Sequence, residues 1–238
     1  MILYGRNPVR EALRGRRAHT VSEVWATAGA AREPWLAGAT VRVAAAEEIE
    51  RRCGSPSHQG ICAAAGPYPY TSAGELLARE DPLIVALDQV QDPQNLGSIC
   101  RTAECVGAGG VVIPQRRAAE VTPAVCKASA GAVEHLPIAR VRNLADFLLA
   151  AREAACWSYG ASAQGASMAY DEPDYSGGVV LVLGSEGEGL RPRVAACCDA
   201  LISLPLLGRM QSLGVSAAAS ATLYEILQNR RHALDNAP

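Results

Sequence analysis

Short apolar stretches alternate with longer amphipathic ones over the last two thirds of the chain. Near-continuous apolar runs such as 83–87 and 179–183 alternate with segments such as 144–154, where apolar residues recur at helical spacing. Strands that are apolar on both faces are typical of a mostly parallel sheet covered by helices on both sides. The sequence therefore predicts an α/β fold. The expected strands are 83–87, 110–113, 136–141, 157–161, 179–183 and 201–205, and the expected helices are 95–106, 123–130, 144–154, 190–198 and 215–228.

The first 66 residues predict a second, smaller α/β unit. Asn7-Pro8 is typical of a helix start with Asn7 as the N-cap, and this helix is expected to end near Gly15. The stretch GPYPYTS at 66–72 breaks both helical and strand periodicity. We therefore expect domains at 1–66 and 82–238, joined by a linker at 67–81. Within the first domain the expected strands are 21–26, 41–44 and 60–65, with a helix at 47–52.

Composition excludes several classes of protein. At 238 residues and 49% hydrophobic content, the chain can bury one sizeable core and a second small one. The absence of a membrane-length apolar run and of a signal peptide predicts a cytosolic location and no membrane contact. Eight cysteines form no C-x-x-C pair and stand at no ligand spacing from the four histidines, so we expect buried free thiols and no metal.

Two groups of arginines are candidates for contacts with phosphates. Arg6, Arg10 and Arg14 recur every four residues and so share one side of the first expected helix. Arg116 and Arg117 follow the strand 110–113. A net charge of −2 argues against a generally polycationic nucleic-acid binder, but charge can be concentrated locally. Both groups are therefore either ordinary solvated surface or local phosphate contacts.

The C-terminal stretch 201–228 joins an apolar strand to a glycine-punctuated loop and then to a helix rich in Ala and Ser. Pro205 should end the strand, because proline cannot donate to a ladder. Ser212 and Ser216 place hydroxyls around the loop, and Ser216 stands where an N-cap is expected. A helix of such small residues lets other backbone approach closely, so we predict a buried helix behind a binding loop.

A second candidate loop, 184–189, follows the strand 179–183 as Gly-Ser-Glu-Gly-Glu-Gly. Its glycines fall as G-x-x-G-x-G, which is not the dinucleotide spacing G-x-G-x-x-G. Its two glutamates would also repel a pyrophosphate, whereas they suit an adenosine or a sulfonium cation. The loop therefore favours S-adenosylmethionine over a dinucleotide.

Three ordered motifs resemble those of the SpoU (TrmH) group of SPOUT-superfamily RNA methyltransferases, which methylate ribose 2′-hydroxyls. They are DPQNLGSICRTAECVGAGGVVIP at 92–114, GSEGEGL at 184–190 and SLGVSAAASATLYE at 212–225. YGRNPVREAL at 4–13 and SHQGICA at 57–63 are similar to the small substrate-binding domain of the rRNA-modifying branch. The likeness extends over the whole chain.

This resemblance implies a fold and a set of partners. The fold would be a C-terminal SPOUT domain with a parallel sheet and a trefoil knot, preceded by an L30e-like substrate-binding domain. The cofactor would be S-adenosylmethionine and the partner RNA. The chain would form a homodimer through the helices 95–106 and 215–228, with an arginine of one subunit approaching the cofactor of the other.

The resemblance also implies roles for particular residues. Arg101 lies off the apolar stripe of its helix and can face a groove, where its guanidinium could bind a phosphate or the developing charge on the 2′-oxygen. Whether Arg101 is a base or a clamp stays open, since a guanidinium remains protonated above pH ~12. The implied catalytic residues are Arg101, Asn95, Glu186 and Ser212; the cofactor-binding residues are Gly184, Glu186, Gly187, Leu204, Leu213 and Ser216; and the RNA-binding residues are Arg6, Arg10, Arg14, Arg116 and Arg117.

One departure from the family pattern keeps other functions open. Gly214 stands where the pattern has asparagine, so an amide that both donates and accepts is missing. The leading hypothesis is 2′-O-methylation of large-subunit (23S) rRNA at a guanosine. The alternatives are the same reaction on tRNA, which the separate N-terminal domain disfavours, and an RNA-binding ribosome-assembly factor that has lost methylation.

Overall fold

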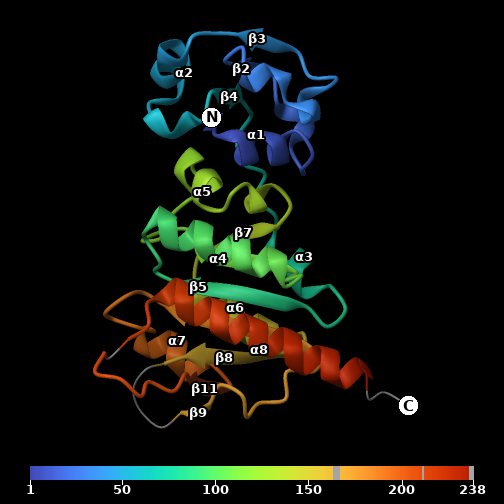
Figure 1. The fold of residues 1–238 in the computed structure, drawn as a ribbon. Coiled ribbons are helices and arrows are strands. Elements are labelled where there is room, and N and C mark those ends of the chain that lie inside the picture. Colours follow the sequence, from blue (N-terminus) through green and yellow to red (C-terminus); the bar gives the residue numbers. More distant parts are fainter. Residues whose placement is uncertain (163–166, 211, 236–238) are drawn as a thin grey trace.

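The computed structural model describes residues 1–162, 167–210 and 212–235, and it contains two β-sheets (Figure 1). The first part of the chain forms the upper unit of Figure 1, and the remainder forms the lower unit, which ends in the long helix α8 (Val215–Asp235). The expected α/β fold with a parallel sheet is confirmed.

The N-terminal unit is built on a four-stranded sheet with the order β1-β4-β2-β3. β4 lies antiparallel to both β1 and β2, while β3 runs parallel to β2. Helix α2 covers one face, where Ile49 packs near Trp25 and Cys62. The elements are β1 (Ile2–Tyr4), α1 (Arg6–Ala12), β2 (Glu23–Ala26), β3 (Val41–Val43), α2 (Ala46–Cys53) and β4 (Ile61–Ala64), with 3₁₀ turns at Ala18–Thr20, Ala30–Arg32, Pro34–Leu36 and Pro56–His58.

Helix α1 differs from its prediction at both ends. Gly5 occupies the N-cap position, so Asn7 lies inside the first turn and does not cap the helix. The helix ends at Ala12 because the following chain turns toward the second unit, where Arg16 N donates to Glu134 O at 2.9 Å. Gly15 packs so closely there that an added Cβ would lie 2.5 Å from Glu134 O. A tertiary contact therefore ends this helix earlier than its sequence predicts.

The C-terminal unit is built on a seven-stranded sheet with the order β7-β6-β5-β10-β8-β11-β9, and all of its neighbouring pairs are parallel. Alternate residues of β5 (Leu83–Asp88) enter different cores. Val85 packs on the side of α4 (Pro93–Cys105) and α8, and Ile84 packs on the side of α6 (Leu144–Glu153) and α7 (Pro192–Cys197). The strands are β5 (Leu83–Asp88), β6 (Gly110–Pro114), β7 (Ile138–Val141), β8 (Cys156–Ala161), β9 (Met168–Ala169), β10 (Gly178–Gly184) and β11 (Ala200–Ser203). The helices besides α8 are α3 (Ala73–Leu77), α4 (Pro93–Cys105), α5 (Pro123–Ala128), α6 (Leu144–Glu153) and α7 (Pro192–Cys197), with a 3₁₀ turn at Ala132–Glu134.

Several helix boundaries differ from their predictions. Helix α4 begins at Pro93 and not at Asn95, because Asp92 Oδ1 accepts a hydrogen bond from Gln94 N at 2.9 Å. Helix α8 begins at Val215, with Ala218 N donating to Gly214 O, so Ser216 lies inside the first turn and the prediction that it caps the helix is wrong. Helix α8 also continues seven residues beyond the expected end, and α7 begins at Pro192 and not at residue 190.

The segment 67–81, expected as a linker, contacts the C-terminal unit along much of its length. Tyr68 is 7% exposed, and its hydroxyl donates to a carbonyl of the second unit, with Val133 O at 2.8 Å and Leu136 O at 3.0 Å. Thr71 N donates to Ile138 O, and the short helix α3 follows. Tyr68 is thus a buried residue that packs this segment against the C-terminal unit.

The cysteines all lie within the described residues and form no disulfide bonds. All eight cysteines are free thiols; Cys62, Cys100, Cys126 and Cys156 are buried as expected, whereas Cys105 is exposed. Across 1–162, 167–210 and 212–235, no group of three or more His, Cys, Asp or Glu side chains could hold a metal ion. Within the same ranges, no helix is long and apolar enough to cross a bilayer.

Candidate functional site

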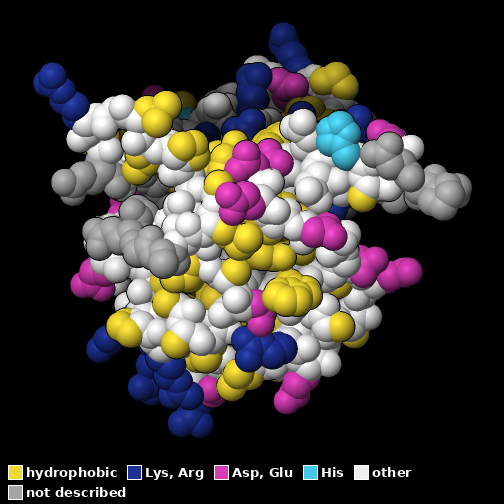
Figure 2. Space-filling view, turned by 90° about the horizontal axis from the view of Figure 1, so that it is seen from below, with side chains coloured by type: hydrophobic (Ala, Val, Ile, Leu, Met, Phe, Trp, Pro, Cys, Tyr) yellow, Lys and Arg dark blue, Asp and Glu magenta, His cyan; other side chains and the backbone are white. Residues whose placement is uncertain are grey.

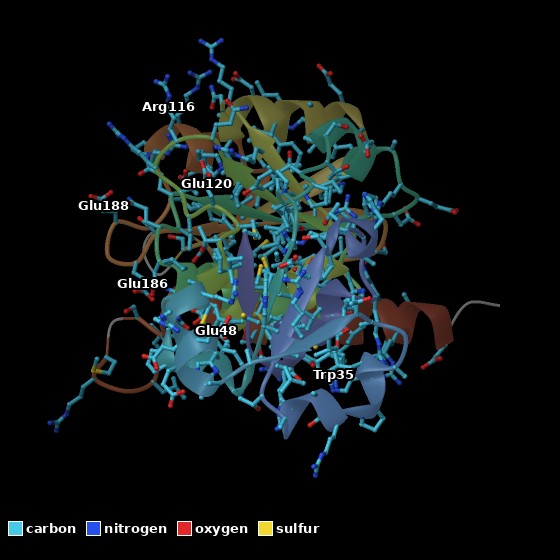
Figure 3. All side chains as sticks on the ribbon, turned by 90° about the horizontal axis from the view of Figure 1, so that it is seen from above. Trp35, Glu48, Arg116, Glu120, Glu186 and Glu188 are labelled. Atoms are coloured by element: carbon cyan, nitrogen blue, oxygen red, sulfur yellow. The ribbon has the colours of Figure 1, made fainter. Side chains whose placement is uncertain are left out.

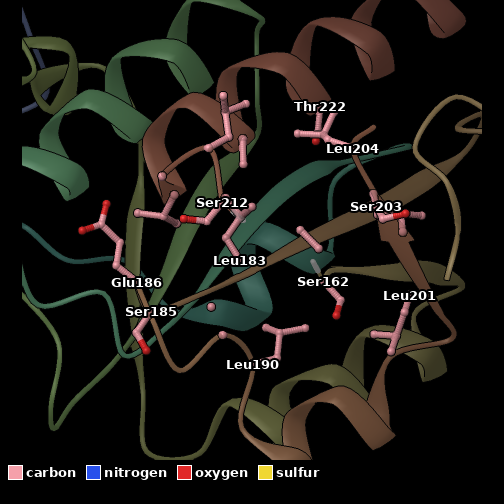
Figure 4. A pocket seen from close by; sticks show the side chains of 18 of the residues that line it. Ser162, Leu183, Ser185, Glu186, Leu190, Leu201, Ser203, Leu204, Ser212 and Thr222 are labelled. Atoms are coloured by element: carbon pink, nitrogen blue, oxygen red, sulfur yellow. The ribbon is translucent and has the colours of Figure 1, made fainter. Parts of the chain in front are cut away.

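The main cavity lies at the carboxyl ends of three neighbouring parallel strands, β8, β10 and β11. Open parallel sheets bind ligands at this edge, because the loops that leave the strands converge there. The volume of about 690 Å³ is that of a small-molecule site. The cavity is lined by 161–162, 183–190, 201–204 and 212–215, together with Tyr170, Ala195, Leu206, Ala218 and Thr222 (Figure 4).

The turn 184–190 is closed tightly upon itself. Ser185 N donates to Gly189 O at 3.1 Å, and Gly189 N donates back to Ser185 O at 3.0 Å. Gly184 has no room for a side chain, since an added Cβ would lie 2.1 Å from the carbonyl carbon of Gly189. The turn therefore presents its backbone to the cavity in a fixed arrangement.

A buried carboxylate holds the exit of this turn. Asp88, at the end of β5, is fully buried and pairs in register with Gly184. Its Oδ2 accepts from Arg191 N at 2.9 Å, and its Oδ1 accepts from Arg191 Nε at 2.7 Å. Because a charge-assisted contact is stronger than a neutral one, this pair fixes the glycine-rich turn against the sheet. Sequence reasoning missed Asp88, whose pairing with the turn depends on strands far apart in the chain.

A second carboxylate fixes β11 against β8. Asp199 Oδ2 accepts from Ser158 N at 2.9 Å and from Ser158 Oγ at 2.6 Å, and Arg152 Nε donates to Asp199 Oδ1 at 2.8 Å. Burial acts to raise the pKa of Asp199, but the bonds from Ser158 and Arg152 outweigh it and lower that pKa. Burial raises the pKa of the neighbouring Cys198 to about 12, which favours the protonated thiol at neutral pH.

Most of the predicted cofactor-binding residues line the main cavity. Ser212, which was predicted to be catalytic, lines it with them. Ser216 does not line it, and its carbonyl accepts from Ser220 Oγ at 2.9 Å within α8. The predicted residues that line the cavity are Gly184, Glu186, Gly187, Leu204 and Leu213.

A smaller side cavity of about 300 Å³ adjoins the main one. It is lined by 89–92, Asn95 and Val215, together with residues of the turn 184–190. Glu186 and Glu188 line both cavities, so their carboxylates stand where the two spaces meet. Asn95 and Glu186, which were predicted from separate motifs, are thereby brought to one site.

Arg101 is not at this site. It is exposed on α4, and it lines neither cavity of its own chain. Leu96, Ile99 and Cys100 form the buried side of the helix, as expected. Helix α4 lies beside α8 (Figure 1), and Thr102 Oγ1 lies 3.0 Å from Ser220 Oγ between them. Arg101 is therefore exposed on α4, near the contact between α4 and α8.

The N-terminal arginines are partly neutralised. Arg6 pairs with Glu33 at 2.9 Å and Arg10 with Glu11 at 2.6 Å, whereas Arg14 is exposed. Two of the three arginines of the expected row are thus paired with carboxylates.

Arg116 and Arg117 are exposed in the loop after β6. Viewed from above, Arg116 lies on the same side of the molecule as Glu186 and Glu188 (Figure 3). The face seen from below carries hydrophobic and acidic side chains in its middle, and several of its basic side chains lie together at the lower left edge (Figure 2).

Comparisons with known proteins agree with this geometry. The model of the SpoU rRNA Methylase family matches residues 82–224, and a model for RNA 2′-O ribose methyltransferase substrate binding matches residues 2–71. A protein of Staphylococcus haemolyticus, named as a TrmH-family tRNA/rRNA methyltransferase, is 35% identical over all of this chain and 99% of its own length. A Synechocystis protein named as a tRNA/rRNA methyltransferase is 45% identical over 73% of this chain, but the match spans only 46% of that protein.

Solved structures give the same result. The SpoU methyltransferase AviRb from Streptomyces viridochromogenes superimposes with a TM-score of 0.81 at 26% identity, over 98% of this chain and 90% of its own. An AdoMet-bound rRNA methyltransferase from Sinorhizobium meliloti gives 0.79 at 28% identity, over 97% of this chain and 87% of its own.

Proposed function

Because this chain belongs to the SpoU rRNA methylase family of S-adenosylmethionine-dependent RNA methyltransferases, we propose that it methylates a ribose 2′-hydroxyl of large-subunit (23S) rRNA, at a guanosine. The observation that carries this proposal is the junction of the two cavities. A space suited to the cofactor meets a smaller space suited to a nucleotide, and residues of two family motifs line their boundary.

The coverage of the solved structures supports rRNA as the substrate. The S. meliloti rRNA methyltransferase matches 97% of this chain, so its likeness includes the N-terminal unit. A TrmH/SpoU tRNA-modifying enzyme from A. aeolicus matches 68% of this chain with a TM-score of 0.59. The N-terminal unit that the rRNA relative shares is the part expected to bind RNA.

The residues of the main cavity fit S-adenosylmethionine. Its walls at Leu183, Leu201 and Leu204 suit a flat, neutral adenine, and Glu186 suits a cation. Gly184, Gly187 and Leu213 would contribute backbone and apolar contacts, and Ser212 a hydroxyl. The cofactor supplies a methyl group that its sulfonium activates for transfer.

The side cavity would hold the target ribose. Asn95 and Glu186 line it, so an amide and a carboxylate are available to orient the 2′-hydroxyl and to accept its proton. Charge that develops on the 2′-oxygen would be stabilised by a cation nearby. No Lys or Arg side chain is among the described residues that line this cavity.

A homodimer would supply that cation. We propose that α4 and α8 form the contact between two copies, so that Arg101 of one copy approaches the cavities of the other. The exposure of Arg101 and of Tyr224, which is 54% exposed on α8, supports this arrangement. Light scattering tests it, because a monomeric mass at micromolar concentration would contradict the dimer. In mixed dimers, an Arg101→Ala chain should be complemented by a chain defective only in its cofactor cavity.

Three further expectations also stay predictions. They are the trefoil knot formed by the chain around 204–213, the L30e likeness of the first domain, and a cytosolic location. A crystal structure traced through 184–213 tests the knot, and a chain that does not pass through a preceding loop would refute it.

Methyl transfer is the direct test of the function. The protein is incubated with labelled S-adenosylmethionine and either undermodified ribosomal RNA or unmodified tRNA, and the methyl group is mapped. Label on a 2′-oxygen of 23S rRNA is the expected result. Label on tRNA would replace the rRNA assignment, and RNA binding without any label would favour an assembly factor.

A further inference from the structure

A buried hydroxyl without a hydrogen-bond partner lines the main cavity. Thr222, on α8, is 1% exposed, and its Oγ1 has no hydrogen-bond partner. The only other such side-chain atom found among the described residues is Arg140 Nε. A threonine inside a helix commonly bonds the carbonyl four residues earlier, here Ala218 O, and Thr222 makes no such bond. A buried polar group left unpaired is unfavourable, so a missing partner needs an explanation.

Thr222 lies at the neutral end of the cavity. Figure 4 places it beside Leu204, with Glu186 at the opposite side of the view. Across the described part of the lining, the charged side chains are Glu186 and Glu188, and both belong to the turn shared with the side cavity. The cavity is therefore polarised, with an acidic mouth and an uncharged interior.

This polarity orients the cofactor. The sulfonium, ammonium and carboxylate of S-adenosylmethionine are charged, and burying a charge without a partner is costly. Adenine and ribose are neutral and need only hydrogen bonds. The nucleoside therefore belongs at the Thr222 end, and the methyl-bearing sulfur belongs near Glu186, where the side cavity opens.

We propose that the Thr222 hydroxyl hydrogen-bonds the nucleoside half of the cofactor, and that this contact fixes which way the cofactor lies. This inference rests on the proposed function and adds to it a residue that helps determine binding. Because the oxygen itself has almost no exposed area, contact requires rotation about χ1, which turns the hydroxyl to another staggered position. Threonine in a helix populates two such rotamers, so the rotation is available.

The test compares variants of the full-length protein by calorimetric binding. Thr222→Val keeps the shape and removes the hydroxyl, and Thr222→Ser keeps the hydroxyl. The control is Thr102→Val, which makes the same change at a hydroxyl that faces Ser220 and does not line either cavity. The probes are S-adenosylhomocysteine and 5′-methylthioadenosine, which carries the nucleoside without the amino acid.

Thr222→Val should raise the Kd of both probes by about 2- to 12-fold, as expected for the loss of one hydrogen bond, while its melting temperature is unchanged or higher. Thr222→Ser and Thr102→Val should bind like the natural protein. Unchanged binding by Thr222→Val would overturn the inference, and so would weakening of S-adenosylhomocysteine alone, which would place the hydroxyl at the amino-acid end. If the natural protein binds neither probe, the proposed function itself fails.

Discussion

The guanidinium of Arg17 and the carboxylate of Glu134 form an ion pair between the two units of the molecule, with Nε donating to Oε2 at 2.7 Å. Both side chains are almost fully buried, at 1% and 0% exposed. Burial acts to lower the pKa of Arg17, but the hydrogen bond and the charge of Glu134 outweigh it and raise that pKa. Two charges that neither domain could bury alone thus neutralise each other at the junction.

We expect Glu134→Gln to destabilise the protein by about 3–5 kcal/mol, because it leaves Arg17 buried without its counter-charge. Chemical unfolding measures the change. The control is Asp146→Asn, which breaks the exposed pair with Arg193 and should cost about 1 kcal/mol or less. A Glu134→Gln variant as stable as the control would show that the ion pair does not hold the units together.

Acid should weaken the same junction at a second point. Glu11 Oε2 lies 2.9 Å from His135 Nε2 across the junction. Burial acts to raise the pKa of Glu11, but His135 and Arg10 outweigh it and lower the pKa below its ordinary 4.5. Ionised Glu11 therefore stabilises the fold at neutral pH, and this contribution is lost as pH falls through the lowered pKa.

Glu11→Gln should be less stable than the natural protein near neutral pH, and the difference should shrink as the pH falls below about 4.5 and then vanish. Urea unfolding of both proteins across this range measures it. A difference that stays constant down to strong acid would contradict the role of Glu11.

Asp88 should act on cofactor binding through the turn it holds. Asp88→Asn is expected to raise the KM for S-adenosylmethionine about 10-fold, with a smaller change in kcat at saturating cofactor, because a charged hydrogen bond to the turn is weakened. Arg191→Ala should have a similar effect, and the double variant should lose little more than either single one. Additive losses would show that the two residues act separately.

Gly214 tests whether the site is catalytic. Its φ is +81°, a conformation that asparagine adopts more readily than most residues, and an added Cβ would lie 3.6 Å from Glu186 Oε1. Under single-turnover conditions, Gly214→Asn should keep or raise the rate. Gly214→Ala should lower it, since alanine adds strain without an amide.

Arg101→Ala should abolish methyl transfer in the same assay.

The natural protein, with Gly214, is expected to react more slowly than the Gly214→Asn variant, by up to about 10²–10³-fold, if the asparagine amide bonds only the transition state. A natural protein that methylates no ribosomal RNA, together with a Gly214→Asn variant that does, would replace the enzyme assignment with that of a binding factor.

Arg116 and Arg117 should contribute to RNA affinity through charge alone. Replacing both by glutamine should weaken RNA binding for all sequences and reduce the salt slope by about 0.7–0.9 for each phosphate that the loop no longer neutralises. Arg193→Gln, on α7, is the control, and its slope should not change. Equal slopes for all three proteins would mean that this loop is ordinary solvated surface.

The elements that the sequence predicts well are those whose signal is local. The buried strand β10 is a continuous apolar run, and helix α4 carries its buried stripe at helical spacing, so both were expected within a few residues. Strands β1 and β9 are only three and two residues long, and neither was predicted.

The site is less predictable because tertiary pairing assembles it. The resemblance of two motifs to those of the family marked Glu186 and Ser212 in advance. Asp88 and Thr222 carry no local signal, since one matters only when β5 lies beside β10 and the other only when α8 covers the cavity. Roles that depend on such distant pairings cannot be derived from a motif.

The order in which the ribosome synthesises the chain limits when the cofactor cavity can form. The main cavity draws its walls from residues between 161 and 222, so it cannot exist until α8 has emerged and packed. Arg17 must likewise wait for Glu134 before its charge is matched. A nascent chain therefore has no complete cofactor site before residue 222 has been synthesised, whereas Glu134 becomes available to Arg17 earlier.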